Sequence, residues 1–198
     1  MTTIEQIQIR TDDAEQAMTF YSSVFGEEFP VVAISGGVRP QGFDGFALSA
    51  LTAQPGDVDL VIAHAANSGA KVLKPAKKSL WGYGGTLSAP DGTIIHVVSE
   101  TKKDSSPVLR KITALVLQLG VADVPASKNF YIEQGLDLSK SYGKRYAEFA
   151  TQNVSVILNR RSDAAKQAGV PDVAPQTHRL VVCSDAGSFT DPDGNEWR

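Results

Sequence analysis

Apolar and polar residues alternate near the start of the chain, and this alternation predicts a β-strand. Residues 6–10 read QIQIR, so Ile7 and Ile9 fall on one face of the strand and the polar side chains on the other. An acidic capping pattern begins at Asp12, and apolar residues then recur at helical spacing until Gly26. We therefore predict a strand with one face in the core, followed by a helix that ends at Gly26.

The second half of the chain repeats this plan. Residues 115–119 alternate in the same way, and the matching helix is predicted from about Asp123 to Gly135. Each half then carries strand-like segments, an intervening helix and a Pro-Asp-Gly turn, at 90–92 and at 192–194. A repeated order of elements indicates a duplicated structural unit.

The repeat predicts an α+β fold built from two modules in tandem. We assign the first module to residues 1–101, a polar linker to 102–110 and the second module to 111–198. Each half contains too little sheet to enclose a core comfortably by itself, whereas the two halves together contain enough.

The composition excludes several classes of partner. The net charge is −3 and the Lys and Arg residues are dispersed, whereas nucleic-acid binding requires a concentrated basic face. No apolar stretch is long enough to cross a bilayer, and the N-terminus has no signal-peptide pattern. We therefore expect a cytoplasmic protein with no membrane partner. Cys183 is the single cysteine, which excludes an intrachain disulfide, and we expect it to pack in a buried strand.

The arrangement resembles the vicinal oxygen chelate superfamily, which includes glyoxalases, bleomycin resistance proteins and extradiol dioxygenases. Three features carry the resemblance: an aspartate seven residues before Phe-Tyr in each half, the run VLKPAKKSLWGYGGTLSAPDG at 72–92, and FTDPDGNEW at 189–197. The resemblance covers essentially the whole chain. It implies two βαβββ modules whose mixed sheets curl around an open cleft, where a ligand or substrate binds.

The resemblance also implies a divalent metal, held by His, Gln or Glu side chains from the first and last strands of the modules. Counting from the helix caps and the closing turns, the corresponding positions in this chain are Gln6, Val116, His96 and Arg198. Valine has no lone pair to donate, and arginine is a fixed cation that opposes a neighbouring metal. Only Gln6 and His96 remain, and as an alternative they gather Ni, Zn or Fe with waters or a partner chain.

Two groups of residues are candidates for ligand binding. His96, within TIIHVV, either fills an apolar wall or faces the cleft as a hydrogen-bonding group or general base. Gln6, Gln8 and Arg10 project from one strand face, and Gln118 holds the place in the second half that Gln8 holds in the first. These four either decorate the rim of the sheet or orient a polar ligand.

The segment SLWGYGG contributes two aromatic candidates, Trp81 and Tyr83. They either cover a ligand or cap the core. The glycines lack phosphate-loop spacing, so nucleotide binding is not indicated. No serine or cysteine lies in a nucleophile elbow or beside a base, so a hydrolase triad is not supported either.

Two functions follow from these observations. The favoured hypothesis is a glyoxalase-like protein that binds a small organic molecule without a metal cofactor, because the metal-ligand set is incomplete. The alternative is an enzyme, a lyase, isomerase or dioxygenase, that uses a metal on Gln6 and His96 or uses His96 as a metal-free base. The sequence is compatible with a monomer or a homodimer.

Overall fold

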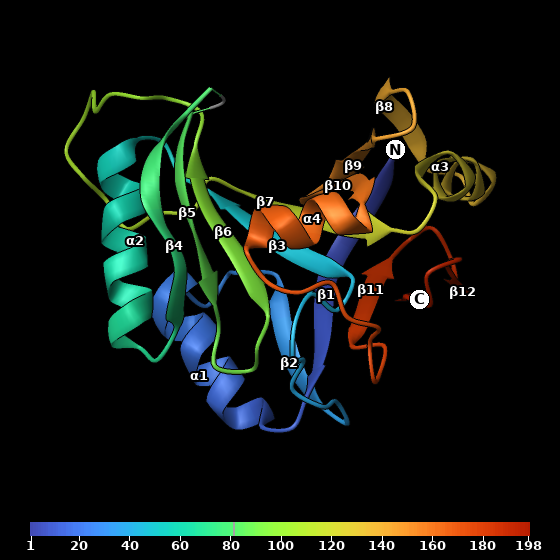
Figure 1. The fold of residues 1–198 in the computed structure, drawn as a ribbon, viewed down its shortest axis with the longest axis horizontal. Coiled ribbons are helices and arrows are strands. Elements are labelled where there is room, and N and C mark those ends of the chain that lie inside the picture. The colour runs from blue at the N-terminus through green and yellow to red at the C-terminus, as the bar shows by residue number, and fades with distance from the viewer. Residues whose placement is uncertain (81) are drawn as a thin grey trace.

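The computed structural model describes residues 1–80 and 82–198, which form helices and strands in a mixed α+β arrangement (Figure 1). The helices are α1 (Ala14–Phe25), α2 (Pro55–Asn67), α3 (Val124–Glu133) and α4 (Arg161–Ala168). The strands of the first half are β1 (Thr2–Thr11), β2 (Val31–Ser35), β3 (Phe46–Leu51), β4 (Lys71–Ser79), β5 (Gly82–Ser88) and β6 (Ile94–Ser99). Those of the second half are β7 (Ala114–Val121), β8 (Asp137–Tyr142), β9 (Tyr146–Gln152), β10 (Val154–Arg160), β11 (Leu180–Ser184), β12 (Phe189–Thr190) and β13 (Glu196–Trp197).

The first helix of each half begins with an aspartate cap. Asp13 accepts a hydrogen bond from the backbone N–H of Gln16, and Asp123 accepts one from Ala126. The predicted start of α1 at Asp12 is therefore one residue too early. Both caps satisfy a backbone donor that would otherwise lack a partner at the helix end.

The strands divide into a large and a small sheet. We call β8-β9-β10-β7-β3-β6-β5-β4 the large sheet and β12-β13-β11-β1-β2 the small sheet. The two are continuous at one point, where the first residues of β1 pair with the end of β9. Every candidate site residue that the structure describes therefore belongs to one sheet or the other.

The large sheet contains two complete βαβββ units. In β3-α2-β4-β5-β6 and in β7-α3-β8-β9-β10, the first strand pairs in parallel with the last, and the three final strands run antiparallel. The small sheet contains two reduced units, β1-α1-β2 and β11-β12-β13, in which the first strand again pairs in parallel with the last. Each half of the chain thus supplies one complete and one reduced unit.

The pairing places parts of each half, 1–101 and 111–198, in both sheets. In the first half, β1 pairs with β2, β11 and β9, whereas β3 pairs with β6. The alternation within a strand indicates which face is buried but not which strand lies beside it. Residues 100–113, between β6 and β7, belong to no helix or strand.

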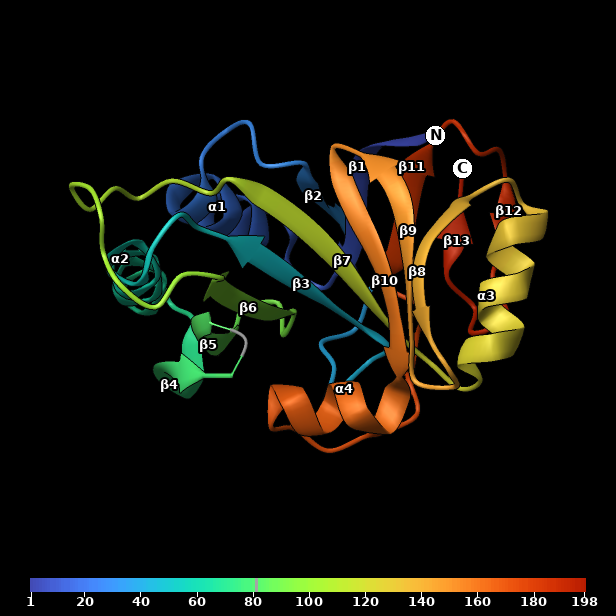
Figure 2. The same ribbon diagram turned by 90° about the horizontal axis from the view of Figure 1, so that it is seen from above.

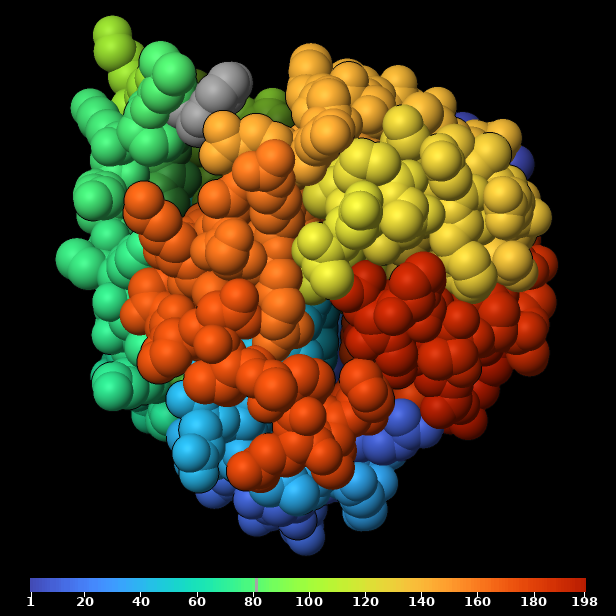
Figure 3. Space-filling model, turned by 45° about the vertical axis from the view of Figure 1, so that its right-hand side comes forward, coloured from blue at the N-terminus to red at the C-terminus, as the bar shows by residue number. Residues whose placement is uncertain are grey.

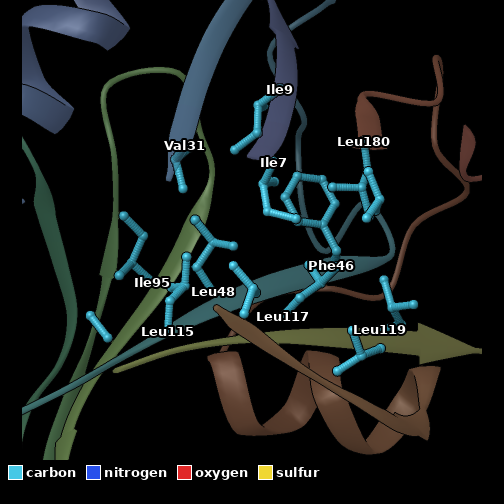
Figure 4. Packing of buried hydrophobic residues seen from close by; sticks show 14 of the residues in the cluster. Ile7, Ile9, Val31, Phe46, Leu48, Ile95, Leu115, Leu117, Leu119 and Leu180 are labelled. Atoms are coloured by element: carbon cyan, nitrogen blue, oxygen red, sulfur yellow. The ribbon is translucent and has the colours of Figure 1, made fainter. Parts of the chain in front are cut away.

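The two sheets pack back to back around one apolar core (Figure 4). Ile7 and Ile9 of β1 face Leu48 of β3 and Leu117 of β7, and all four side chains are fully buried. Helices α1, α2 and α3 add their apolar residues to the same core. Because successive side chains of a strand point to opposite faces, the residues between these core positions face outward from each sheet.

Helix α4 lies on the other side of the large sheet from α1 (Figure 2). Its alanines 164, 165 and 168 pack with Phe43, Ala47 and Ile94 in a small cluster separate from the main core. The outward face of the large sheet, which we call the cleft face, is therefore partly covered by α4. No helix in the described residues is long and apolar enough to span a membrane.

The tyrosine of each repeated Phe-Tyr pair contacts the turn that contains the Pro-Asp-Gly sequence of its half. The Tyr21 hydroxyl donates to Asp91 in the turn between β5 and β6, and the Tyr131 hydroxyl donates to Asp191 in the turn between β12 and β13, at 3.0 and 2.5 Å. Each tyrosine of a first helix therefore fixes the closing turn of its own half of the chain. In each turn the glycine has positive φ, 85° and 89°, a conformation that glycine adopts without strain.

We predict that Tyr131→Phe lowers the free energy of unfolding by about 1–2 kcal/mol, because it removes a buried hydrogen bond and keeps the ring. Urea unfolding followed by circular dichroism measures the change. Tyr142→Phe is the matched control, since the Tyr142 side chain is 67% exposed on β8. Equal stabilities of the two variants would show that the Tyr131–Asp191 bond does not hold the last turn.

Candidate functional site

A cavity of about 330 Å³ lies on the cleft face of the large sheet. Its wall includes Ser49 of β3, Thr86 of β5, His96 of β6 and Gln118 of β7, and each of these residues is no more than 8% exposed. The strand register brings them together: Ser49 lies opposite His96, and His96 lies opposite Thr86. Four polar side chains from four neighbouring strands therefore line one cavity.

These polar side chains are hydrogen bonded in pairs. The amide nitrogen of Gln118 donates to the Ser49 hydroxyl at 2.5 Å, and the Thr86 hydroxyl lies 2.9 Å from Nδ1 of His96. The first bond links the two complete βαβββ units, because β3 belongs to one and β7 to the other. The second bond fixes the orientation of the imidazole ring and leaves Nε2 as its other polar atom.

His96 is uncharged at neutral pH. Burial, together with a smaller contribution from the nearby ammonium group of Lys74, lowers its pKa to about 4. A neutral imidazole can donate or accept a hydrogen bond, depending on its tautomer. A general base is most effective when its pKa lies near the working pH, so this His96 is better suited to binding than to proton transfer.

Helix α4 limits the cavity on one side. The Lys74 ammonium donates to the backbone oxygens of Lys166 and Gln167 at 2.9 and 2.7 Å, at the C-terminal end of α4 where carbonyl groups lack helical partners. Gln167 itself lines the cavity. At the other end of the helix, Arg161 donates to the backbone oxygens of Phe43 and Val173. Both ends of α4 are thus attached by cationic side chains.

Three of the candidates from the sequence line this cavity, namely His96, Gln118 and Tyr83. The Tyr83 hydroxyl, however, donates to Asp59 on α2 at 2.8 Å, so its polar end is already engaged. Trp81 lies outside the described residues. The sequence analysis missed Ser49, Thr86 and Lys74, because they enter the site through cross-strand pairing and the position of α4, which no local motif signals.

The other candidates, Gln6, Gln8 and Arg10, lie on the outward face of the small sheet. The Gln8 amide donates to Gln6 at 2.9 Å, Arg198 donates to Gln8, and Arg10 forms an ion pair with Glu196 at 2.5 Å. Cys183, expected in the core, is only partly buried because it pairs with Gln6 in register and shares its outward face. These residues form a polar surface of their own.

The structure does not bring Gln6 and His96 together. Gln6 faces away from the core that Ile7 enters, and His96 faces away from the core that Ile95 enters. The two side chains consequently point outward from opposite sheets, with the apolar core between them. One metal ion cannot be bound by both.

The cavity also does not fit the divalent metal that the fold family implies. The described residues contain no group of three or more His, Cys, Asp and Glu side chains arranged to hold a metal. The cavity lining holds one imidazole, His96, and one carboxylate, Glu100, among amide and hydroxyl groups, and the Lys74 cation is close enough to His96 to lower its pKa. Divalent metals are bound by imidazole, thiolate or carboxylate groups, and a neighbouring ammonium opposes them electrostatically.

Solved structures with this fold include glyoxalase I from Zea mays. That match covers 100% of this chain and 91% of the maize chain, with a TM-score of 0.63 and 14% sequence identity. A putative dioxygenase from Bacillus subtilis matches 91% of this chain and 69% of its own, with a TM-score of 0.53 and 10% identity. No protein-family model and no curated protein sequence matches the chain. The chain therefore has the fold of the vicinal oxygen chelate superfamily, and the fold predicted from the sequence is confirmed.

The low pKa of His96 predicts how stability depends on pH. Above pH 6.5 the ring is neutral in both the folded and the unfolded chain, whereas between pH 6.5 and about 4 only the unfolded chain binds the proton. The free energy of unfolding should then fall with decreasing pH, by about 3 kcal/mol at pH 4 from this group.

Urea unfolding at several pH values between 7.5 and 4 tests this expectation, with His96→Gln as the comparison. The difference in the free energy of unfolding between wild type and variant should change with pH. The variant lacks the titrating ring, whereas both proteins contain the same carboxylates. If the free energies of unfolding of the two proteins changed in parallel with pH, this would contradict the conclusion that His96 is buried and neutral.

Proposed function

We propose that this protein binds a small organic molecule in the cavity of the cleft face, without a metal. The observation that carries the proposal is the convergence of His96, Gln118, Ser49 and Thr86 on a cavity of about 330 Å³. That volume is at the lower end of the range for ligand pockets, which combine apolar walls with a few polar groups. The ligand is therefore expected to be small.

The chemistry of the wall indicates which groups the ligand carries. Gln118 uses one amide hydrogen on Ser49, so its second N–H and its carbonyl oxygen are available to a ligand. His96 offers Nε2, and it is neutral. Val98 and Pro75 supply apolar surface in the same cavity. A compact molecule with a hydrogen-bonding group at one end and an apolar remainder meets these conditions.

The enzyme alternative is less well supported by the geometry. Its metal requires Gln6 and His96, which face outward from opposite sheets. Its metal-free form requires His96 to take a proton from a substrate, and a pKa of about 4 makes the ring a weak proton acceptor. Binding makes no such demand, because a neutral imidazole forms hydrogen bonds without changing its charge.

We predict that a thermal-shift screen of small organic compounds finds ligands that raise the melting temperature, and that Gln118→Leu weakens their binding about 10-fold, as expected for the loss of one hydrogen bond. Gln8→Leu is the matched control. Gln8 holds the equivalent position in β1 but lies on the small sheet, where it contacts Gln6 and Arg198. Its replacement should leave ligand affinity unchanged.

Two outcomes would contradict the proposal. Equal loss of affinity in both variants would indicate that the ligand does not bind in the cavity of the cleft face. Stoichiometric nickel, zinc or iron in protein purified without chelator, and lost in His96→Ala, would favour the metal-dependent enzyme. Ligand titration of the two glutamine variants tests the first outcome, and elemental analysis of the wild type and His96→Ala tests the second.

A further inference from the structure

A second, smaller cavity lies between two loops that join the reduced units to the complete ones. Residues 36–45 connect β2 to β3, and residues 169–179 connect α4 to β11. The loops are in direct contact, since the Phe43 N–H donates to the Pro171 oxygen at 2.8 Å. Figure 3 shows the orange-red loop beside the light-blue one. The cavity between them measures about 90 Å³, and its wall includes Asp44, Thr177 and Arg179.

The wall of this cavity adjoins a buried group of charges. Arg179 pairs with Asp44 at 2.9 Å and with Asp91 at 3.1 Å, and the three side chains are 1%, 3% and 1% exposed, respectively. Asp91 has further donors in the Tyr21 hydroxyl and in the N–H and hydroxyl of Thr93. When both carboxylates are ionised, one guanidinium balances only one of them, so the group carries a net charge of −1.

Two buried oxygen atoms at this cavity lack partners. Within the described part of the chain, Oδ1 of Asp44 and Oγ1 of Thr177 are both withheld from solvent and have no hydrogen-bond partner. Both residues line the cavity. A buried carboxylate oxygen without a donor is unfavourable. Burial also raises the pKa of Asp44, which is the direction expected of a carboxylate whose charge is incompletely balanced.

We propose that this cavity is a binding site for one small monovalent cation, namely potassium, sodium or ammonium. A single positive charge balances the excess charge of the Arg179 group, and Asp44 Oδ1 and Thr177 Oγ1 supply two oxygen ligands. The amide side chains of Gln41 and Gln176 belong to the same wall and offer neutral oxygens. A volume of about 90 Å³ equals the space of about three water molecules, which suits one ion with a bound water.

Charge and ligand type favour a monovalent over a divalent ion. Calcium takes six to eight oxygen ligands, commonly including several carboxylates. In this wall the ionisable oxygen ligand is Asp44 alone, and Arg179 already neutralises part of its charge. A divalent ion would therefore leave an excess of positive charge in a buried place. The site lies outside the cavity of the cleft face and is independent of the function proposed there.

The melting temperature of the protein in different chlorides tests the cation site. Potassium, sodium, ammonium and choline chloride are compared at equal ionic strength and over a range of concentrations, since choline is too large for the cavity. We expect at least one small cation to raise the melting temperature by about 3 °C relative to choline at ten times its dissociation constant, with saturation. If the melting temperature depended on salt concentration identically in all four chlorides, the proposal would be overturned.

Two variants show where the cation acts. Thr177→Val removes one ligand oxygen and keeps the charge, so it should raise the half-saturating concentration several-fold. Thr190→Val, at an exposed position of β12, is its control and should behave like the wild type. Asp44→Asn should abolish the cation effect if it folds. If it does not fold, the Thr177→Val comparison decides, and an unchanged cation effect in that variant would overturn the assignment to this cavity.

Discussion

Burial of one face of each sheet in a common core is the constraint on which the rest of the structure depends. Ile7 and Ile9 on one sheet and Leu48 and Leu117 on the other occupy the same apolar interior. The alternation of side chains then turns every intervening residue outward. The outward residues of the large sheet line the candidate ligand cavity, and those of the small sheet form a separate polar surface.

The sequence predicts faces and turns well, because both are encoded locally. The alternation at residues 6–10 and the aspartate at 123 correctly indicate a strand and a helix cap. Strand partners are determined by contacts between residues far apart in the sequence, so local patterns do not predict which strands pair. The Gln6 and His96 alternative assumed that similar places in two halves share one cleft, whereas the pairing of β1 with β11 assigns Gln6 to the other sheet.

The internal repeat is unequal in a way that matters for function. The complete units meet through β3 and β7, and the reduced units meet through β1 and β11, in the same antiparallel manner. In the complete pair, Gln118 bonds to Ser49 and lines a cavity. In the reduced pair, the equivalent Gln8 bonds to Gln6 and Arg198. In the reduced pair, the polar groups thus form hydrogen bonds with one another.

Helix α4 touches the cleft face through three alanines and is attached at its ends by Lys74 and Arg161. It takes no part in the main core, so its length can vary without disturbing the packing that holds the two sheets together. A lengthened or shortened α4 would change how much of the cleft face is open. The segment between β10 and β11 therefore sets how open the cleft face is, independently of the main core.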